Sequence, residues 1–122
     1  MKKNLGSQLL AEFYDCDPAA INDKEVIRSA MLQAAVAANA TIVADIFHEF
    51  NPHGISGVVV IAESHIAIHS WPEHACASVD IFTCSENLDT KAAVSCLQAL
   101  FKSQRVEVRS VARGLVETKE AK

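Results

Sequence analysis

The stretch GVVVIAESHIAIHSWPEHACASVDIFT, residues 57–83, predicts the centre of a β-sheet. It begins with a continuous apolar run over 57–62, which is typical of a strand buried on both faces. A second strand is predicted over 66–71, where Pro72 stops it, and a third over 77–83. Three strands joined by such short connections favour antiparallel pairing.

Three flanking segments complete the expected sheet. Residues 7–15 and 105–112 alternate apolar and polar positions, and 41–50 is rich in β-branched and aromatic residues. The turn residues 51–54 separate this last segment from the central run. We expect the polar tail after Gly114 to be frayed.

Two helices are predicted between the strands. Asn22 is expected to cap the first, with Glu25 at its third helical position, and Asn87 or Asp89 to open the second. Each helix has one apolar stripe at helical spacing: Ile27, Ala30, Met31, Ala34 and Ala38 in the first, and Ala93, Leu97, Leu100 and Phe101 in the second.

The order of these elements predicts the fold class. It argues for a single α+β domain over residues 1–122, a two-layer sandwich in which two helices cover one face of a mostly antiparallel sheet. The run 57–62 needs cover on its second face as well, and the sequence offers no third helix. We therefore expect a homodimer packed sheet to sheet, in an α-β-β-α arrangement.

Composition favours a small-molecule role. Fifteen acidic residues against eleven basic ones give a net charge of -4, so we expect no nucleic-acid partner. The N-terminal residues contain no signal-peptide core and no apolar run approaches the roughly 18 residues that span a bilayer, so we expect a cytoplasmic protein without a membrane partner. The four cysteines form no CxxC pair and are expected to be free thiols.

The reactive side chains concentrate between His48 and Cys84, and residue types alone leave several chemistries open. His65 and His69 have the spacing of two zinc ligands on a helix, but on a strand their rings lie about 13 Å apart, which argues against a metal site. Cys84 with His69 could form a nucleophile and base, although a lone cysteine is more often a small buried hydrophobe.

Two motifs in this region narrow the choice. The run from Glu63 to Glu73 has the form ESH-x-x-x-H-[ST]-W-P-E, and the run from Asp80 to Cys84 has the form DxFTC. With these motifs the chain resembles the prokaryotic S-adenosylmethionine decarboxylases. The resemblance extends over nearly the whole chain, through Gly6, residues 9–14, His48, Phe50, Pro52, Gly54, Ser56 and Gly57.

The resemblance implies a precursor that cleaves itself between Glu63 and Ser64. The products would be residues 1–63 and residues 64–122, and Ser64 would become a pyruvoyl group, the cofactor of the enzyme. This ketone would form a Schiff base with the α-amine of S-adenosylmethionine and accept the electrons left by departing CO₂. The product of the family supplies the aminopropyl group for spermidine synthesis.

The resemblance also assigns roles in this chemistry. His69 would remove the α-proton of Ser64, Ser56 would stabilise the cyclic intermediate of cleavage, and Cys84 would protonate the decarboxylated substrate. Ser64 and His69 are an odd number of residues apart and would face opposite sides of a continuous strand. We therefore expect the backbone to turn or twist near Ser64 and His65, with a strained scissile peptide. No step is assigned to His65.

Substrate-binding residues follow from the same resemblance. Phe50 and Trp71 match aromatic positions that line the adenine pocket, and Glu73 matches the acceptor for the ribose hydroxyls, whereas ordinary core packing is the alternative for both rings. Phe50 and Trp71 are expected to reach one pocket from opposite subunits. Ser85 and Gln8 depart from the residues usual in the family, so arginine or ornithine is an alternative substrate. A non-catalytic α+β module that binds a small ligand is a further alternative.

Overall fold

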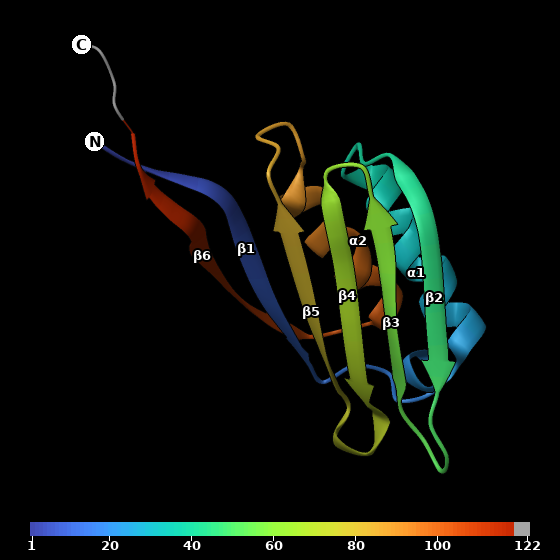
Figure 1. The fold of residues 1–122 in the computed structure, drawn as a ribbon. Helices are drawn as coiled ribbons and strands as arrows, with labels where there is room; N and C mark the ends of the chain where they lie inside the picture. The colour runs from blue at the N-terminus through green and yellow to red at the C-terminus, as the bar shows by residue number, and fades with distance from the viewer. Residues whose placement is uncertain (119–122) are drawn as a thin grey trace.

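The computed structural model describes residues 1–118, which form six strands and two α-helices in the predicted order (Figure 1). The elements are β1 (Lys2–Tyr14), α1 (Lys24–Ala37), β2 (Ile42–Glu49), β3 (Ile55–Ile61), β4 (Ser64–Trp71), β5 (Cys76–Thr83), α2 (Thr90–Phe101) and β6 (Arg105–Glu117). Two short 3₁₀ turns, η1 (Ala20–Asn22) and η2 (Pro72–His74), lie before α1 and between β4 and β5.

The strands form one antiparallel sheet in the order β2-β3-β4-β5-β1-β6, and both helices lie on the same face of it (Figure 1). The prediction of a two-layer α+β sandwich is confirmed. The prediction that the run 57–62 is buried on both faces is wrong for the single chain. Val59 and Ile61 are buried under the helices, but Val60 on the opposite, open face is 40% exposed because no element within residues 1–118 covers it.

The core lies between the sheet and the helices. Alternate residues of the central strands and the predicted stripe of α1 are buried together, and the rings of Phe13 and Phe101 join β1 to α2 in an edge-to-face contact at 5.5 Å. Gly57 is required by this packing, since a Cβ there would lie 2.0 Å from the Phe47 ring of the neighbouring strand. The Phe47 ring thus packs directly on the backbone of β3.

The helix caps are partly as predicted. Asp23 caps α1 in place of Asn22, because its extended backbone lets its carboxylate accept hydrogen bonds from the backbone N–H groups of Glu25 and Val26. Asn22 instead accepts a hydrogen bond from the N–H of Gly54 at 3.1 Å. Asp89 caps α2, which decides between the two expected candidates. No helix within residues 1–118 is long and apolar enough to cross a membrane.

The first and last strands are longer than predicted. β1 begins at Lys2, which pairs with Glu117, so the segment 115–117 is a strand and not a frayed end. A long partner strand satisfies the backbone of this segment, which sequence periodicity did not reveal. Residues 119–122, the rest of the tail expected to be frayed, lie outside the described residues. Beyond the pairing with β5, the two strands continue as a ribbon that projects from the sheet (Figure 1).

Candidate functional site

The turn between β3 and β4 carries the predicted cleavage point. Ile61 pairs with Ser64, so Ala62 and Glu63 form a two-residue hairpin loop. Such loops favour positive φ angles at their central residues, usually through Gly or Asn. Here the positive φ falls on Ser64, at 148°, a region unfavourable for any side chain. The expected twist and strain therefore occur at Ser64 itself.

The peptide bond predicted to be cleaved, between Glu63 and Ser64, contacts the end of β5. The carbonyl oxygen of Glu63 accepts a hydrogen bond from the backbone N–H of Cys84 at 3.2 Å, and Ser64 Oγ lies 4.0 Å from Cys84 Sγ. A small cavity of about 80 Å³ adjoins Cys84 and is lined by the start of the projecting ribbon. The structure thus brings together the residue that would be cleaved and the residue predicted to donate a proton.

Cys84 differs from the other cysteines of the chain. Its side chain is exposed, so the alternative of a small buried hydrophobe is wrong for this residue. Cys16 is buried, and desolvation raises the pKa of its thiol to about 11. Cys76 and Cys96 are half-buried, and burial raises the pKa of both thiols as well. Cys84 is therefore the thiol that is open to a substrate.

The side chain of Glu63 is held by a residue that the sequence did not single out. The backbone N–H of Thr41 donates to Glu63 Oε1 at 3.1 Å, and Thr41 Oγ1 donates to Glu63 Oε2 at 3.4 Å. The backbone hydrogen bond from Thr41 is the main reason why the pKa of Glu63 lies below its ordinary value. Only the fold reveals this contact, since 22 residues separate the two positions.

A second group of predicted residues lies at the opposite end of the sheet. Ser56 and His69 are cross-strand partners on β3 and β4, and Ser56 Oγ lies 2.7 Å from His69 Nδ1, which fixes the orientation of the imidazole. Ser78 of β5 is the next cross-strand neighbour of His69 and donates a hydrogen bond to Glu12 of β1. Ser78 and Glu12 were not predicted; their signal was a polar position between apolar neighbours on each strand.

The predicted binding residues lie at this same end. Phe50 and Trp71 are 48% and 42% exposed, so ordinary core packing does not account for them. The Trp71 ring lies 6.3 Å from the ring of His69. Glu73, in η2 after Trp71, lies with its Oε1 3.0 Å from Nε2 of His53, a contact that connects η2 to the loop between β2 and β3.

The two groups do not meet within one chain. β4 is paired with β5 along its whole length, from Ser64 to Trp71. Five residues at about 3.3 Å each separate Ser64 from His69 by roughly 16 Å, and Trp71 lies about 7 Å further along. The twist at Ser64 rotates the backbone there without shortening this path. The family resemblance placed all these residues in one site, but in a single chain they form two separate groups at opposite ends of β4.

His65, which had no assigned step, packs against a neighbouring strand. Its ring stacks on the ring of Phe82 with the centroids 5.8 Å apart, and the guanidinium of Arg113 lies 5.9 Å from the same ring. These contacts connect β4, β5 and β6 beside the cleavage turn. Within the structure His65 has a packing role.

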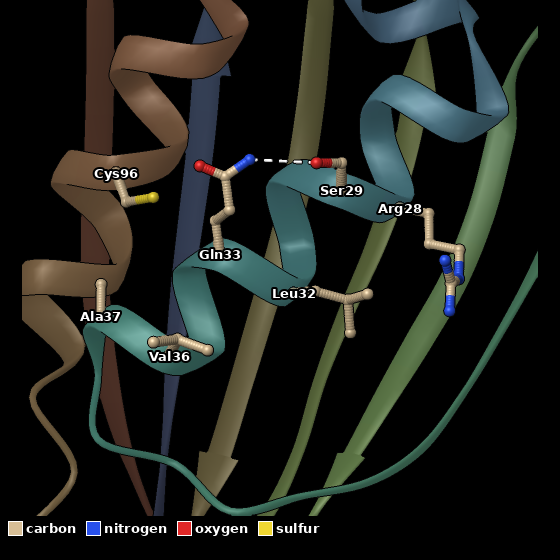
Figure 2. Close-up of a pocket in the computed structure, with 7 residues that line it drawn as sticks. All are labelled: Arg28, Ser29, Leu32, Gln33, Val36, Ala37 and Cys96. Atoms are coloured by element: carbon tan, nitrogen blue, oxygen red, sulfur yellow. Dashed lines mark hydrogen bonds between the residues drawn. The ribbon is translucent and has the colours of Figure 1, made fainter.

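A larger hollow lies elsewhere, on the outer surface of the two helices (Figure 2). It has a volume of about 590 Å³ and is lined by Arg28, Ser29, Leu32, Gln33, Val36, Ala37 and Cys96. Gln33 is hydrogen-bonded to Ser29, and Arg28 forms an ion pair with Asp45. None of the motif residues lines this hollow, so we do not assign the functional site to it.

Comparisons with known proteins point to one family. A family model described as S-adenosylmethionine decarboxylase matches residues 7–114. An S-adenosylmethionine decarboxylase proenzyme of Fervidobacterium nodosum is 50% identical over 112 residues, which cover 92% of this chain and 82% of the relative. A proenzyme of the same name from Pseudomonas paraeruginosa is 52% identical over 111 residues, or 91% of this chain and 69% of that protein.

A solved structure extends the similarity to the fold. The crystal structure of the adenosylmethionine decarboxylase from Aquifex aeolicus VF5 superimposes with a TM-score of 0.87 at 36% sequence identity. The match covers 98% of this chain and 99% of the other. The six-stranded sheet with two helices is therefore the architecture of that enzyme as well.

Proposed function

Because this chain belongs to the S-adenosylmethionine decarboxylase family, we propose that it cleaves itself between Glu63 and Ser64 and then decarboxylates S-adenosylmethionine. The observation that carries the proposal is the geometry of Ser64, whose φ angle is 148° and whose hydroxyl faces the exposed thiol of Cys84. The word proenzyme in the names of the relatives supports the self-cleavage.

The cleavage begins with an acyl shift. Ser64 Oγ attacks the carbonyl carbon of Glu63, the C–N bond breaks, and the hydroxyl proton passes to the nitrogen, which leaves an ester and a free amine. The Cys84 N–H, 3.2 Å from the carbonyl oxygen, donates to the negative charge that develops there. Strain at Ser64 raises the energy of the starting peptide and so favours the reaction.

Elimination and hydrolysis complete the self-processing. His69 removes the Cα proton of Ser64, and Glu63 leaves as a carboxylate, which converts residue 64 into dehydroalanine. Water adds to the imine form of this residue and ammonia leaves, so that the fragment 64–122 begins with a pyruvoyl group and the fragment 1–63 ends at Glu63. Ser56 holds the His69 ring through the 2.7 Å contact at Nδ1.

The residues around Ser64 fit such a group. When formed, a pyruvoyl group supplies a carbonyl that accepts the electron pair left by departing CO₂. Position 64 holds it at the end of the sheet, beside the exposed Cys84. The Cys84 thiol is close enough to donate a proton to the α-carbon of a substrate bound there.

A homodimer would complete the site. His69 lies too far from Ser64 in its own chain, so the His69 that acts on Ser64 would come from a second copy. Phe50 and Trp71 lie at the His69 end of one chain and would come from that same copy, in place of the expectation that the two rings reach one pocket from opposite subunits. The open sheet face offers the surface for this contact: Ile46 and Val60 lie on it beside Phe50 and Trp71, with 40 to 70% exposure. A twofold axis across this face would set the Ser64 end of one chain against the His69 end of the other.

The binding residues suit an adenosyl substrate. Phe50 and Trp71 present exposed rings on which adenine can stack, and Glu73 presents a carboxylate that can accept hydrogen bonds from ribose hydroxyls. Arginine and ornithine have no aromatic group for the two rings. The product, decarboxylated S-adenosylmethionine, would supply the aminopropyl group for spermidine.

Release of labelled CO₂ tests the proposal. Self-processed protein is incubated separately with carboxyl-labelled S-adenosylmethionine, arginine and ornithine. We expect release from S-adenosylmethionine alone. Release from arginine or ornithine instead would overturn the substrate assignment, and a protein that stays at full-length mass and releases no CO₂ would overturn the enzyme assignment.

A further inference from the structure

The side chain of Glu63 is held in place although the proposed cleavage uses only its backbone carbonyl. Its carboxylate accepts two hydrogen bonds from Thr41, one from the backbone N–H and one from the hydroxyl. In return, the carbonyl oxygen of Thr41 accepts a hydrogen bond from the N–H of Ala62 at 2.8 Å. Three hydrogen bonds therefore connect Ala62 and Glu63, the two loop residues of the hairpin, to Thr41. We call these three hydrogen bonds the clip.

The local backbone of β2 makes this clip possible. The pairing of β2 with β3 shifts register between Ile42 and Ala44, which is the mark of a bulge or similar irregularity. Thr41 comes just before this irregularity and outside the strand, so its N–H is available to a side chain. Thr41 therefore lies beside the irregular end of β2 and faces the turn between β3 and β4.

The clip and the Cys84 hydrogen bond hold residue 63 from opposite sides. Thr41, before β2, fixes the side chain and Cys84, after β5, fixes the carbonyl oxygen. The loop residues Ala62 and Glu63 do not include the Gly or Asn that favours positive φ angles, and the positive φ angle falls on Ser64. A strained backbone of this kind relaxes unless the surrounding structure holds it. Two anchors, one just before β2 and one just after β5, prevent that relaxation.

We infer that Thr41 is a positioning residue for self-cleavage, which acts through the Glu63 side chain to hold the scissile carbonyl where Ser64 Oγ can attack it. This inference rests on the proposed function. The affected step is the acyl shift, in which the bond from Ser64 Oγ to the Glu63 carbonyl carbon forms and the peptide C–N bond breaks. The hydrogen bonds of the clip take no part in proton transfer. They raise the fraction of precursor molecules in which Ser64 Oγ is positioned to attack the Glu63 carbonyl carbon.

The test is a time course of self-cleavage after cell-free synthesis, followed by mass spectrometry. Glu63→Ala removes both acceptors and is expected to slow cleavage about tenfold or more, because hydrogen bonds to a charged group are lost. Thr41→Val removes the hydroxyl and keeps the N–H, so a reduction of about threefold is expected. Glu49→Ala, at the far end of β2, and Thr118→Val, beyond β6, are the matched controls and should cleave at the wild-type rate.

Two further readouts separate positioning from a general loss of structure. If Thr41 acts only through Glu63, the double variant Thr41→Val/Glu63→Ala should cleave no more slowly than Glu63→Ala alone. Hydroxylamine cuts esters and not peptides. Variants of Thr41 and Glu63 are expected to be blocked before the ester forms, so their full-length chains should resist hydroxylamine. The His69→Ala precursor is expected to stop at the ester, so hydroxylamine should cut it.

Three results would overturn the inference: cleavage of Glu63→Ala at the wild-type rate, additive slowing in the double variant, or an ester trapped in the clip variants. Failure of the proposed function is a different result, namely that the wild-type chain is not cut between residues 63 and 64. If the wild-type chain and the variants of Thr41 and Glu63 are all cut at the same rate, Thr41 has no positioning role, and the enzyme assignment still stands.

Discussion

The two ends of the sheet differ in how they hold their chemistry. At the β3–β4 turn, Glu63, Ser64 and Cys84 are held by backbone geometry, with a strained φ angle and a hydrogen bond to the scissile carbonyl. At the opposite end, the imidazole of His69 and the ring of Trp71 are exposed side chains at the end of a regular strand. Under the proposed function the first end breaks a peptide bond and the second binds the substrate and moves a proton, and the length of β4 keeps the two ends apart within one chain.

If the two ends act as halves of one site, assembly is a condition of activity. Loss of the Ser64 hydroxyl should then stop the self-cleavage of the chain that carries the change, and a change of His69 should act on a neighbouring copy. Variants of Ser64, His69, Cys84 and Trp71 test that division.

Replacement of the cleaved serine has the largest expected effect. Ser64→Ala has no hydroxyl to attack Glu63 and should remain a single full-length species in an intact-mass spectrum, with no CO₂ release. Ser95→Ala, at an exposed position of α2, is the control and should yield both fragments. Two fragments from Ser64→Ala would remove Ser64 from the mechanism.

Mixed dimers test whether the two ends come from different chains. Ser64→Ala and His69→Ala should each fail to cleave when made alone. When they are co-expressed, a mixed dimer pairs an intact Ser64 with an intact His69 across the interface, so roughly half of the His69→Ala chains should be cut if the two chains mix at random. Mass spectrometry distinguishes the two chains. No cleavage in the mixture would mean that His69 acts within its own chain.

Cys84→Ala should separate self-cleavage from decarboxylation. The backbone N–H at position 84 remains, so the chain should still be cut, but loss of the proton donor should lower kcat by roughly 10²- to 10⁴-fold. Labelled CO₂ release measures the rate and the mass spectrum reports the cut. Cys96→Ala, at a half-buried position of α2, provides the comparison and should keep its activity. Normal turnover in Cys84→Ala would exclude this thiol as the donor.

Trp71→Ala should have the smallest effect of the four and act on binding. Loss of one stacking surface is expected to raise KM for S-adenosylmethionine by roughly tenfold, within the 1–3 kcal/mol typical of base stacking on an aromatic ring, and to leave the self-cleavage unchanged. Val36→Ala removes an exposed apolar residue from α1 and should leave KM unchanged. A KM unaffected by Trp71→Ala would place the adenine elsewhere.

Much of the fold could be predicted because its signals are local. The apolar run at 57–62, the alternation in the flanking strands and the stripe of α1 predicted six strands and two helices in the right order. The errors have local causes as well. Asn22 and Asp23 are both good caps, and sequence alone does not show that Asp23 takes the extended backbone of the cap while Asn22 accepts a hydrogen bond from the N–H of Gly54. The ends of β1 and β6 depend on their mutual pairing, which has no periodic signal.

The amino-acid sequence by itself identified the residues predicted to carry the chemistry, because the family resemblance rests on the ESH and FTC motifs, which specify reactive side chains by type and spacing. Only the tertiary structure decided where these residues lie. A strand extends by about 3.3 Å per residue, so Ser64 and His69, which are close together in the motif, lie at opposite ends of the sheet. Conversely, Thr41 and Glu63 are far apart in the chain and become hydrogen-bonded partners, because adjacent strands bring distant segments into contact.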